Sequence, residues 1–300
     1  MRIALVANPT AGKGTARAAM SIAVARLRER DVDVTELVGR DGDEALELCR
    51  QAVADGTDAL VALGGDGMAH LALQAVAGTF TPLGIVAAGT GNDLATHLGL
   101  PVRNPVAAAD VVADGHTRTI DSVRLTPLDR WFGCVLGAGF DSVVNERANL
   151  MRWPKGPQRY NLAIAAELPR FRPMPFRLTL DGEVWETEAM LVAVGNASSY
   201  GAGMKVTPDA QIDDGLLDVF VLGPVGKVDF LRTFPRVFKG THLSHPAATL
   251  RRARVVTLDA PGVVAYADGE RMSALPLTCE CVPGAVRMLV PAAGPREEVR

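Results

Sequence analysis

The sequence predicts a two-domain α/β protein, and three observations carry this prediction. The chain has 300 residues, which is about two domains at the usual ~100–200 residues each. In its first third, short Val-, Ile- and Leu-rich runs alternate with segments of helical periodicity, as in a mostly parallel sheet covered by helices. Further on, short β-rich segments are separated by Gly, Pro and Asp-Gly turns, which indicates an antiparallel β-sandwich. We expect an α/β domain over residues 1–120 and a β-sandwich domain over residues 121–300, with a cleft between them.

Local patterns justify each element of the first domain. Strands are expected where apolar runs end in turn residues, over residues 3–7, 32–38, 58–63 and 83–87. The first helix is predicted from apolar residues at helical spacing, namely Met20, Ala23, Val24 and Leu27. Asp41 followed by Glu44 forms a capping box for a second helix, and a third helix spans about 68–77. Asn104 as N-cap, Pro105 at the first helical position and Gly115 beyond the end frame a further helix.

The second domain is predicted from short β-rich segments, with one helix inserted over about 158–168. These segments cover residues 177–180, 189–195, 217–222, 254–258, 263–267 and 286–290.

Composition excludes several classes of protein. Apolar residues make up 48% and charged residues 22%, which excludes disordered, collagen-like and coiled-coil chains. A net charge of −3 gives no global attraction to nucleic acid, so we expect no nucleic-acid partner. No apolar run approaches the ~20 residues that cross a bilayer, and the first residues lack the pattern of a signal peptide. The four cysteines lack CxxC spacing, so we expect buried, reduced thiols in a cytoplasmic protein.

Three glycine-rich segments follow predicted strands and are candidates for binding phosphate. Glycines at strand ends let the backbone adopt positive φ and bring several N–H groups close to an anion at a helix N-terminus. The spacing of a P-loop is absent, because Ala7 and Gly14 stand where its first glycine and its Ser or Thr belong, and the dinucleotide fingerprint is missing as well. Each segment alone is compatible with ordinary turn chemistry. The candidate residues are Asn8, Pro9, Thr10, Ala11 and Gly12, then Gly64, Gly65, Asp66 and Gly67, then Thr90, Asn92 and Asp93.

Carboxylates cluster in two tight turns of the second half, over residues 209–218 and 266–270. They could be turn formers, ligands of a hard cation or proton acceptors. Taken singly, an Asp-Gly pair most often only forms a hairpin turn.

In this order, the motifs resemble those of bacterial diacylglycerol kinases and related lipid kinases, a family that includes sphingosine and ceramide kinases. The motifs are Asn-Pro-x-Ala-Gly, Gly-Gly-Asp-Gly, Gly-Thr-x-Asn-Asp, Asp-Asp-Gly-x-Leu and Asp-Gly-Glu, and together they span essentially the whole chain. The resemblance implies an NAD-kinase-like α/β domain that binds ATP, followed by a β-sandwich. The implied activity is ATP- and Mg²⁺-dependent phosphorylation of a lipid hydroxyl, such as that of diacylglycerol, to give a product such as phosphatidic acid.

The resemblance also implies a role for each motif. The residues from Asn8 to Gly12 and from Gly64 to Gly67 would contact the ATP phosphates, with Thr90 nearby. Asp66, Asn92 and Asp93 would hold the catalytic Mg²⁺ and its waters. Asp268, as first choice, or Glu270 would accept the proton of the lipid hydroxyl. A second, structural Mg²⁺ would be bound by the Asp214 carboxylate and the carbonyls of Gln211 and Leu216.

The sequence departs from the family pattern after Gly-Gly-Asp-Gly. Met68, His70 and Leu71 replace the usual Thr and Asn-Glu residues, and Gly39 lacks a hydroxyl that relatives carry. Met68 and Leu71 favour one alternative, a non-catalytic nucleotide-binding regulator. The retained carboxylates argue against it more strongly, and these are Asp66, Asp93, Asp214, Asp268 and Glu270. The other alternative is a kinase for a different hydroxyl lipid, such as a sphingoid base, ceramide or phosphatidylglycerol.

Basic and aromatic residues crowd one region and indicate a surface for peripheral contact with an anionic membrane, with a solvated helix as the alternative. These residues are Arg147, Arg152, Trp153, Lys155, Arg159, Tyr160, Arg170, Phe171, Arg172 and Arg177.

Overall fold

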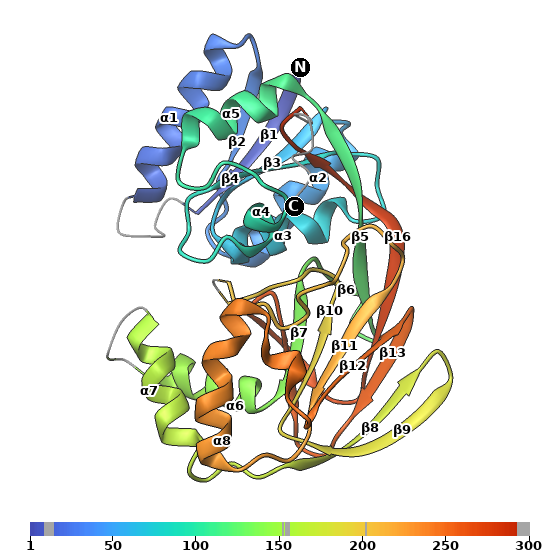
Figure 1. Cartoon of the computed structure of the whole chain (residues 1–300). Coiled ribbons are helices and arrows are strands. Elements are labelled where there is room, and N and C mark those ends of the chain that lie inside the picture. The colour runs from blue at the N-terminus through green and yellow to red at the C-terminus, as the bar shows by residue number, and fades with distance from the viewer. Residues whose placement is uncertain (9–14, 152, 154–156, 202, 293–300) are drawn as a thin grey trace, which may run out of the picture. The chain divides into compact units, whose positions relative to one another are not determined.

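The computed structural model describes residues 1–8, 15–151, 153, 157–201 and 203–292 (Figure 1). The chain forms two compact units. The first contains Met1–Ser122 and the segment that begins at Pro283, and the second contains Val123–Val282. The sequence-based boundary at residue 120 lies close to the first crossover. The sequence-based boundary placed the end of the chain in the second domain, whereas the segment from Pro283 returns to the first unit. The residues of a strand do not by themselves indicate which strand it will pair with.

The first unit is built on a parallel sheet. Its strands are β1 (Arg2–Ala7), β2 (Asp33–Leu37), β3 (Ala59–Gly64) and β4 (Leu83–Ala87), joined by the last part of β16 (Leu277–Leu289). The order is β2-β1-β3-β4-β16, and each neighbouring pair is parallel. The predicted strand at 286–290 therefore belongs to this sheet and not to the sandwich. Parallel strands have their carboxyl ends at one edge, where ligands of such sheets bind.

Helices cover both faces of this sheet. They are α1 (Thr15–Glu29), α2 (Gly42–Ala54), α3 (Asp66–Val76), α4 (Asp93–His97) and α5 (Pro105–Asp114). Alternate strand residues such as Ile3, Leu5 and Val61 share one buried core with α1 and α5. The predicted caps are present: the Asp41 carboxylate accepts the Glu44 N–H (2.9 Å), and Asn104 Oδ1 accepts the Ala107 N–H (3.1 Å). The return bond of the capping box differs from the prediction, because Glu44 accepts the N–H of Arg40 (2.6 Å).

The second unit is a β-sandwich, as the sequence predicted. One sheet has six antiparallel strands in the order β12-β11-β10-β7-β14-β15. Its strands are β7 (Val135–Gly139), β10 (Leu191–Gly195), β11 (Leu217–Leu222), β12 (Ala248–Ala253), β14 (Val264–Ala267) and β15 (Glu270–Ala274). The facing sheet contains β5 (Thr117–Thr126), β6 (Arg130–Phe132), β8 (Met174–Leu180), β9 (Glu183–Ala189), β13 (Val255–Asp259) and the first part of β16. Buried residues of both sheets form one core, which includes Val192, Val219, Cys279 and Cys281.

Helices pack on the other face of the six-stranded sheet. They are α6 (Phe140–Leu150), α7 (Pro157–Glu167), α8 (Lys227–Thr233) and the short 3-10 helices η2 (Phe234–Lys239) and η3 (His242–Ser244). Of these helices, the sequence predicted α7 alone. On β11, Val219 and Val221 point into the sandwich core, while Phe220 and Leu222 point toward these helices. This strand is buried on both faces.

All four cysteines are buried and free. Burial raises the pKa of the Cys49 thiol to about 12. None of the described helices has the length and hydrophobicity to span a membrane.

Candidate active site

Asp66 holds two of the glycine-rich segments together at the carboxyl edge of the parallel sheet. It is the first residue of α3, directly after β3, and its carboxylate accepts the backbone N–H groups of Asn92 (2.8 Å) and Asp93 (2.6 Å). Asn92 lies in the left-handed region with φ of 58°, which Asn tolerates better than most residues. The segment after β4 is therefore fixed against the start of α3.

The two segments approach so closely that their contact requires glycine. A Cβ on Gly89 would lie 2.4 Å from the Gly65 Cα, and a Cβ on Gly91 would lie 2.4 Å from Asp66 Oδ2. The buried Asn92 side chain fastens the same turn, since it accepts the Gly89 N–H (2.9 Å) and donates to the Gly89 carbonyl (2.9 Å). Its amide is thus engaged in holding the loop. Of the residues proposed to surround Mg²⁺, Asp66 and Asp93 are the two that carry a carboxylate.

The same edge offers groups that bind phosphate. Gly65 caps α3 without a side-chain acceptor, so the first N–H groups of this helix are available to an anion. Gly67, Thr90 and Asn8 are exposed around it, and Gly64 is half-buried. Pro9, Thr10, Ala11 and Gly12 lie outside the described residues.

Arg103 is a cation at this edge that sequence reasoning missed. Its backbone N–H donates to the Ala87 carbonyl (2.8 Å), and its exposed guanidinium lies 3.4 Å from the carbonyls of Gly89 and Thr90. A lone arginine outside any motif gives no sequence signal, so only the fold brings it to the loop.

The departures from the family pattern have local explanations. His70 is buried in α3, 3.4 Å from the Gln74 amide. A side chain at position 39 has no room, because a Cβ on Gly39 would lie 2.5 Å from the Ala45 nitrogen.

The donor set of the first unit fits Mg²⁺. The Asp93 carboxylate is half-buried beside Asp66, and each Asp66 oxygen keeps a lone pair beyond the one used by a backbone N–H. Mg²⁺ prefers oxygen ligands, retains several waters and needs one or two carboxylates plus phosphates.

Asp268 and Glu270, the two candidates for the base, lie in very different surroundings. Asp268 and Gly269 have φ of 51° and 83°, the positive values of a two-residue hairpin turn between β14 and β15. The Asp268 carboxylate accepts the N–H groups of Gly133 (2.7 Å) and Cys134 (2.9 Å), which tie the turn to the start of β7. Glu270 is exposed at the start of β15.

A second Asp-Gly-Glu turn in the chain shows what such an aspartate does. Asp181 and Gly182 join β8 to β9 with φ of 48° and 91°. The Asp181 carboxylate likewise accepts backbone N–H groups of the adjoining strand, those of Arg254 (3.1 Å) and Val255 (2.8 Å). The carboxylate of Asp268 thus has the contacts of a turn-forming aspartate.

The Asp-Asp-Gly turn already contains a positive charge. Asp214 accepts the Leu216 N–H (3.1 Å) and forms an ion pair with Arg252, whose Nε lies 3.6 Å from the buried carboxylate of Asp218. Burial raises the pKa of Asp218, and nearby Arg252 opposes that shift. Arg252 thus pairs with the one carboxylate of the predicted set of Asp214, Gln211 and Leu216. Binding of a second Mg²⁺ by this set stays a prediction.

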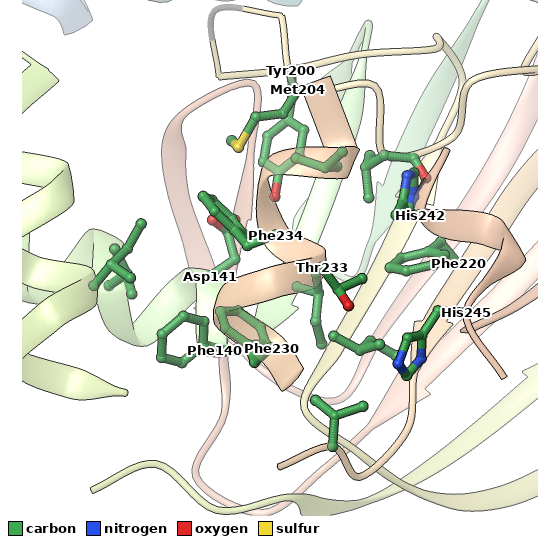
Figure 2. A pocket seen from close by; sticks show the side chains of 17 residues that line it. Phe140, Asp141, Tyr200, Met204, Phe220, Phe230, Thr233, Phe234, His242 and His245 are labelled. Atoms are coloured by element: carbon green, nitrogen blue, oxygen red, sulfur yellow. Dashed lines mark hydrogen bonds between the residues drawn. The ribbon is translucent and has the colours of Figure 1, made fainter. Parts of the chain in front are cut away.

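A cavity lies between the six-stranded sheet and the helices of the second unit (Figure 2). Its empty volume, with the space at its open mouth included, is about 760 Å³. Its wall is mostly apolar and aromatic, with Phe140, Phe220, Phe230 and Phe234 as the main rings. The rings of Phe140 and Phe230 meet edge to face at 5.0 Å, and Phe230 stacks on Phe234 at 5.8 Å. Sequence reasoning missed this cavity, because its residues come from segments far apart in the chain.

A few polar groups interrupt the apolar wall, among them Asp141, Tyr200, Thr233 and His242. His242 is 4% exposed, and its Nε2 lies 3.0 Å from the Val206 carbonyl. Burial lowers the pKa of His242, so the ring is neutral and Nε2 carries the proton. Its Nδ1 is then an acceptor, and it makes no hydrogen bond within the described part of the chain.

Several residues of the predicted basic surface contact other parts of the protein, and are therefore not all available to a membrane. Arg147 pairs with Glu167, Arg177 lies 4.0 Å from Glu186, and the Phe171 ring packs on Phe140. Trp153 is 78% exposed, as a membrane contact requires. Arg152, Lys155 and the side chain of Tyr160 lie outside the described residues.

Comparison with known proteins assigns the chain to a family. Residues 2–125 match the diacylglycerol kinase catalytic domain, and residues 134–290 match the YegS C-terminal NAD kinase beta sandwich-like domain. The chain belongs to the diacylglycerol kinase family, and it is a lipid kinase that phosphorylates an alcohol group. The recognition made from the five motifs is confirmed.

Individual relatives agree with this assignment. A diacylglycerol kinase of Mycobacterium tuberculosis is 47% identical over 297 residues, which cover 98% of this chain and 96% of the relative. A probable YegS-like lipid kinase of Xanthomonas oryzae pv. oryzae is 30% identical, covering 93% and 94%. The fold resembles a diacylglycerol kinase from Bacillus anthracis (TM-score 0.72, 23% identity, 96% of each chain). It also resembles an NAD kinase from Archaeoglobus fulgidus in complex with ATP (TM-score 0.56, 14% identity, 96% and 93%). The expected NAD-kinase-like fold is therefore confirmed.

Proposed function

We propose that the chain transfers the γ-phosphate of ATP, with Mg²⁺, to the free hydroxyl of diacylglycerol and so forms phosphatidic acid. The observation that carries this proposal is the Asp66 carboxylate, which fixes the segment of Gly89, Asn92 and Asp93 against the N-terminus of α3. Phosphoryl transfer depends on positioning and charge neutralisation more than on covalent chemistry. A rigid edge of backbone N–H groups and carboxylates suits that requirement.

The residues of the first unit would position the triphosphate. The first N–H groups of α3 and the Arg103 guanidinium offer donors to phosphate oxygens. Asp93 and Asp66 would hold the magnesium ion, which when bound neutralises charge on the β- and γ-phosphates. We retain the predicted contacts from the segment between Asn8 and Gly12 as part of this proposal.

Glu270 is the better candidate for the base that accepts the hydroxyl proton. The Asp268 carboxylate is occupied by the N–H groups of Gly133 and Cys134, whereas Glu270 is exposed. A carboxylate within hydrogen-bond reach of a hydroxyl accelerates transfer by about 10²–10⁴-fold. We therefore assign Asp268 to holding the turn, and Glu270 to proton transfer.

The cavity of the second unit would take the hydrocarbon chains of the lipid. Apolar walls with few polar groups favour alkyl chains, and the Nδ1 of His242 could accept a hydrogen bond from a bound hydroxyl or amide group. The other candidate lipids, a sphingoid base, ceramide and phosphatidylglycerol, also offer a hydroxyl and long chains.

The test is incubation of the purified chain with γ-labelled ATP, Mg²⁺ and each candidate lipid in mixed micelles. We expect label in phosphatidic acid when diacylglycerol is present, and loss of that label when Mg²⁺ is chelated. Label in a different lipid names another acceptor. Label in free phosphate alone, or nucleotide binding without any transfer, would contradict the proposal and favour a regulator.

A further inference from the structure

Residues 224–239, which we call the port segment, form one side of the cavity. The segment contains α8 and η2, and it carries Phe230, Thr233 and Phe234, which are labelled in Figure 2. These residues and Val237 recur at helical spacing and line the cavity. One face of the port segment is therefore the wall of the proposed lipid site.

The port segment also exposes apolar residues that do not line the cavity. Val228, Leu231 and Phe238 are 63%, 56% and 49% exposed. A helix on the surface of a water-soluble domain ordinarily has polar residues on its outer face, whereas here exposed apolar residues share that face with basic ones. Single exposed apolar residues are ordinary, but here they recur on the outer side of a cavity wall.

Two contacts connect the port segment to the neighbouring helices. The Lys227 ammonium donates to the Pro169 carbonyl, which attaches the start of α8 to the end of the α7 region. The rings of Phe140 and Phe230 link α6 to α8. In the same helical layer, Leu150 is 83% exposed, Trp153 78% and Leu162 44%.

Charge identifies the partner of this surface. The port segment contains four basic residues and one acidic residue, Asp229, which lies 3.0 Å from the His245 ring. The basic residues are Lys227, Arg232, Arg236 and Lys239. Apolar side chains between basic groups are typical of a helix that lies in the interface of an anionic bilayer. A protein partner would need no cavity directly behind its docking surface, whereas a bilayer supplies the molecules that the cavity is suited to hold.

We propose that the port segment lies in the interface of an anionic membrane and is the side through which a lipid enters the cavity. Val228, Leu231 and Phe238 would rest among the acyl chains, with Arg232 and Lys239 at the headgroups. Lys227 and Arg236 add positive charge nearby, while they donate to Pro169 and to Thr241 and Ser244. This inference rests on the proposed function, because it names where that lipid comes from. It places the membrane contact on α8 and η2, whereas the sequence indicated the region around Arg147 to Arg177.

The experiment is co-sedimentation with vesicles of phosphatidylcholine containing about one third phosphatidylglycerol, which carry the anionic charge that the basic residues would meet. The test variant is Val228→Ser with Leu231→Ser, which removes apolar area from α8 without changing charge. The matched control is Ile22→Ser with Val184→Ser, since these side chains are 45% and 48% exposed on α1 and β9. Thermal unfolding of all three proteins verifies that they fold.

We expect the test variant to bind these vesicles at least about tenfold more weakly than the wild type, because buried alkyl area sets interfacial affinity. The control should remain within about twofold of wild type, since its substitutions lie off the proposed contact. Binding of the wild type should fall with added salt and with removal of phosphatidylglycerol. Equal binding by test and control variants, or wild-type binding that ignores both salt and anionic lipid, would overturn the inference. If the test variant kept vesicle binding but lost binding to a protein, the surface would be a protein-docking site, and the inference would also be overturned.

A second readout separates this inference from the proposed function. Phosphorylation of dihexanoylglycerol, which dissolves without vesicles, should be the same in the test variant and the wild type. If this transfer occurs while vesicle binding does not depend on α8, the inference fails and the function stands. If no lipid is phosphorylated, whether in vesicles, in micelles or dissolved, but the test variant loses vesicle binding, the proposed function is wrong and the proposed membrane surface is supported.

Discussion

Replacing Asp66 by Asn tests whether one carboxylate assembles the phosphate-binding edge. The carboxylate accepts two backbone N–H groups, those of Asn92 and Asp93, through Oδ2 and Oδ1. Hydrogen bonds to a charged group contribute about 1.5–3 kcal/mol each. Asn keeps one oxygen acceptor and turns an NH₂ group toward the other N–H, so one bond is lost and a donor faces a donor.

Because Asp66 is half-buried, we take the lower part of that range and expect a loss of about 2 kcal/mol. For a domain of this size the melting temperature should fall by about 4–8 °C. Since Asn92 and Asp93 would no longer be fixed, ATP affinity should fall at least about tenfold, which corresponds to ~1.4 kcal/mol.

The assays are thermal unfolding, urea unfolding and calorimetric titration with ATP. The control is Asp33→Asn, an exposed residue of β2, which should change stability by less than about 0.5 kcal/mol. If Asp66→Asn also stayed within that margin and bound ATP like the wild type, the loops would not depend on Asp66 and this reasoning would be refuted.

Two further predictions concern charges in the second unit. Burial lowers the pKa of His242 below its ordinary 6.5, so below that pH the unfolded chain binds a proton that the folded chain excludes. Stability should therefore fall as the pH drops below 6.5, and His242→Phe should have a shallower pH slope, by at most about 1.4 kcal/mol per unit. Equal slopes in urea unfolding would contradict this. Arg252→Met should destabilise the chain by about 1–3 kcal/mol, because it leaves Asp214 and Asp218 uncompensated, and millimolar Mg²⁺ should restore part of the loss only in the variant. A wild-type melting temperature that drops on chelation would instead reveal a resident metal ion.

Local signals were sufficient for several elements of the first unit. Asn104, Pro105 and Gly115 marked α5 to the residue, because caps are set by backbone hydrogen bonds within a few positions. The strand at 83–87 was likewise correct, since a buried parallel strand is an uninterrupted apolar run.

Features that depend on distant contacts were not predictable. The final strand β16 returns to pair with β4, and no local pattern encodes a sheet partner. The cavity joins Phe140, Phe220 and Phe234 from separate segments. Arg252 meets Asp214 only through the pairing of β12 with β11.

The two Asp-Gly-Glu turns show that a short motif alone does not define the role of its carboxylates. The motif directed attention to Asp268, but the same tripeptide at Asp181 forms an ordinary hairpin turn with comparable hydrogen bonds. Only the contacts of each carboxylate separate an aspartate that holds a turn from a glutamate that is free to meet substrate.

The most direct test of the whole account is the rate of labelled phosphate transfer to diacylglycerol by Glu270→Gln, with Glu183→Gln of the other turn as its control. We expect Glu270→Gln to lower kcat by about 10²–10⁴-fold while its melting temperature and ATP affinity match the wild type, and Glu183→Gln to keep full activity. Asp268→Asn, in contrast, should unfold at a lower temperature, because its carboxylate accepts the Gly133 and Cys134 N–H groups. Near wild-type turnover by Glu270→Gln would contradict proton transfer at this turn, and with it the mechanism proposed for this kinase.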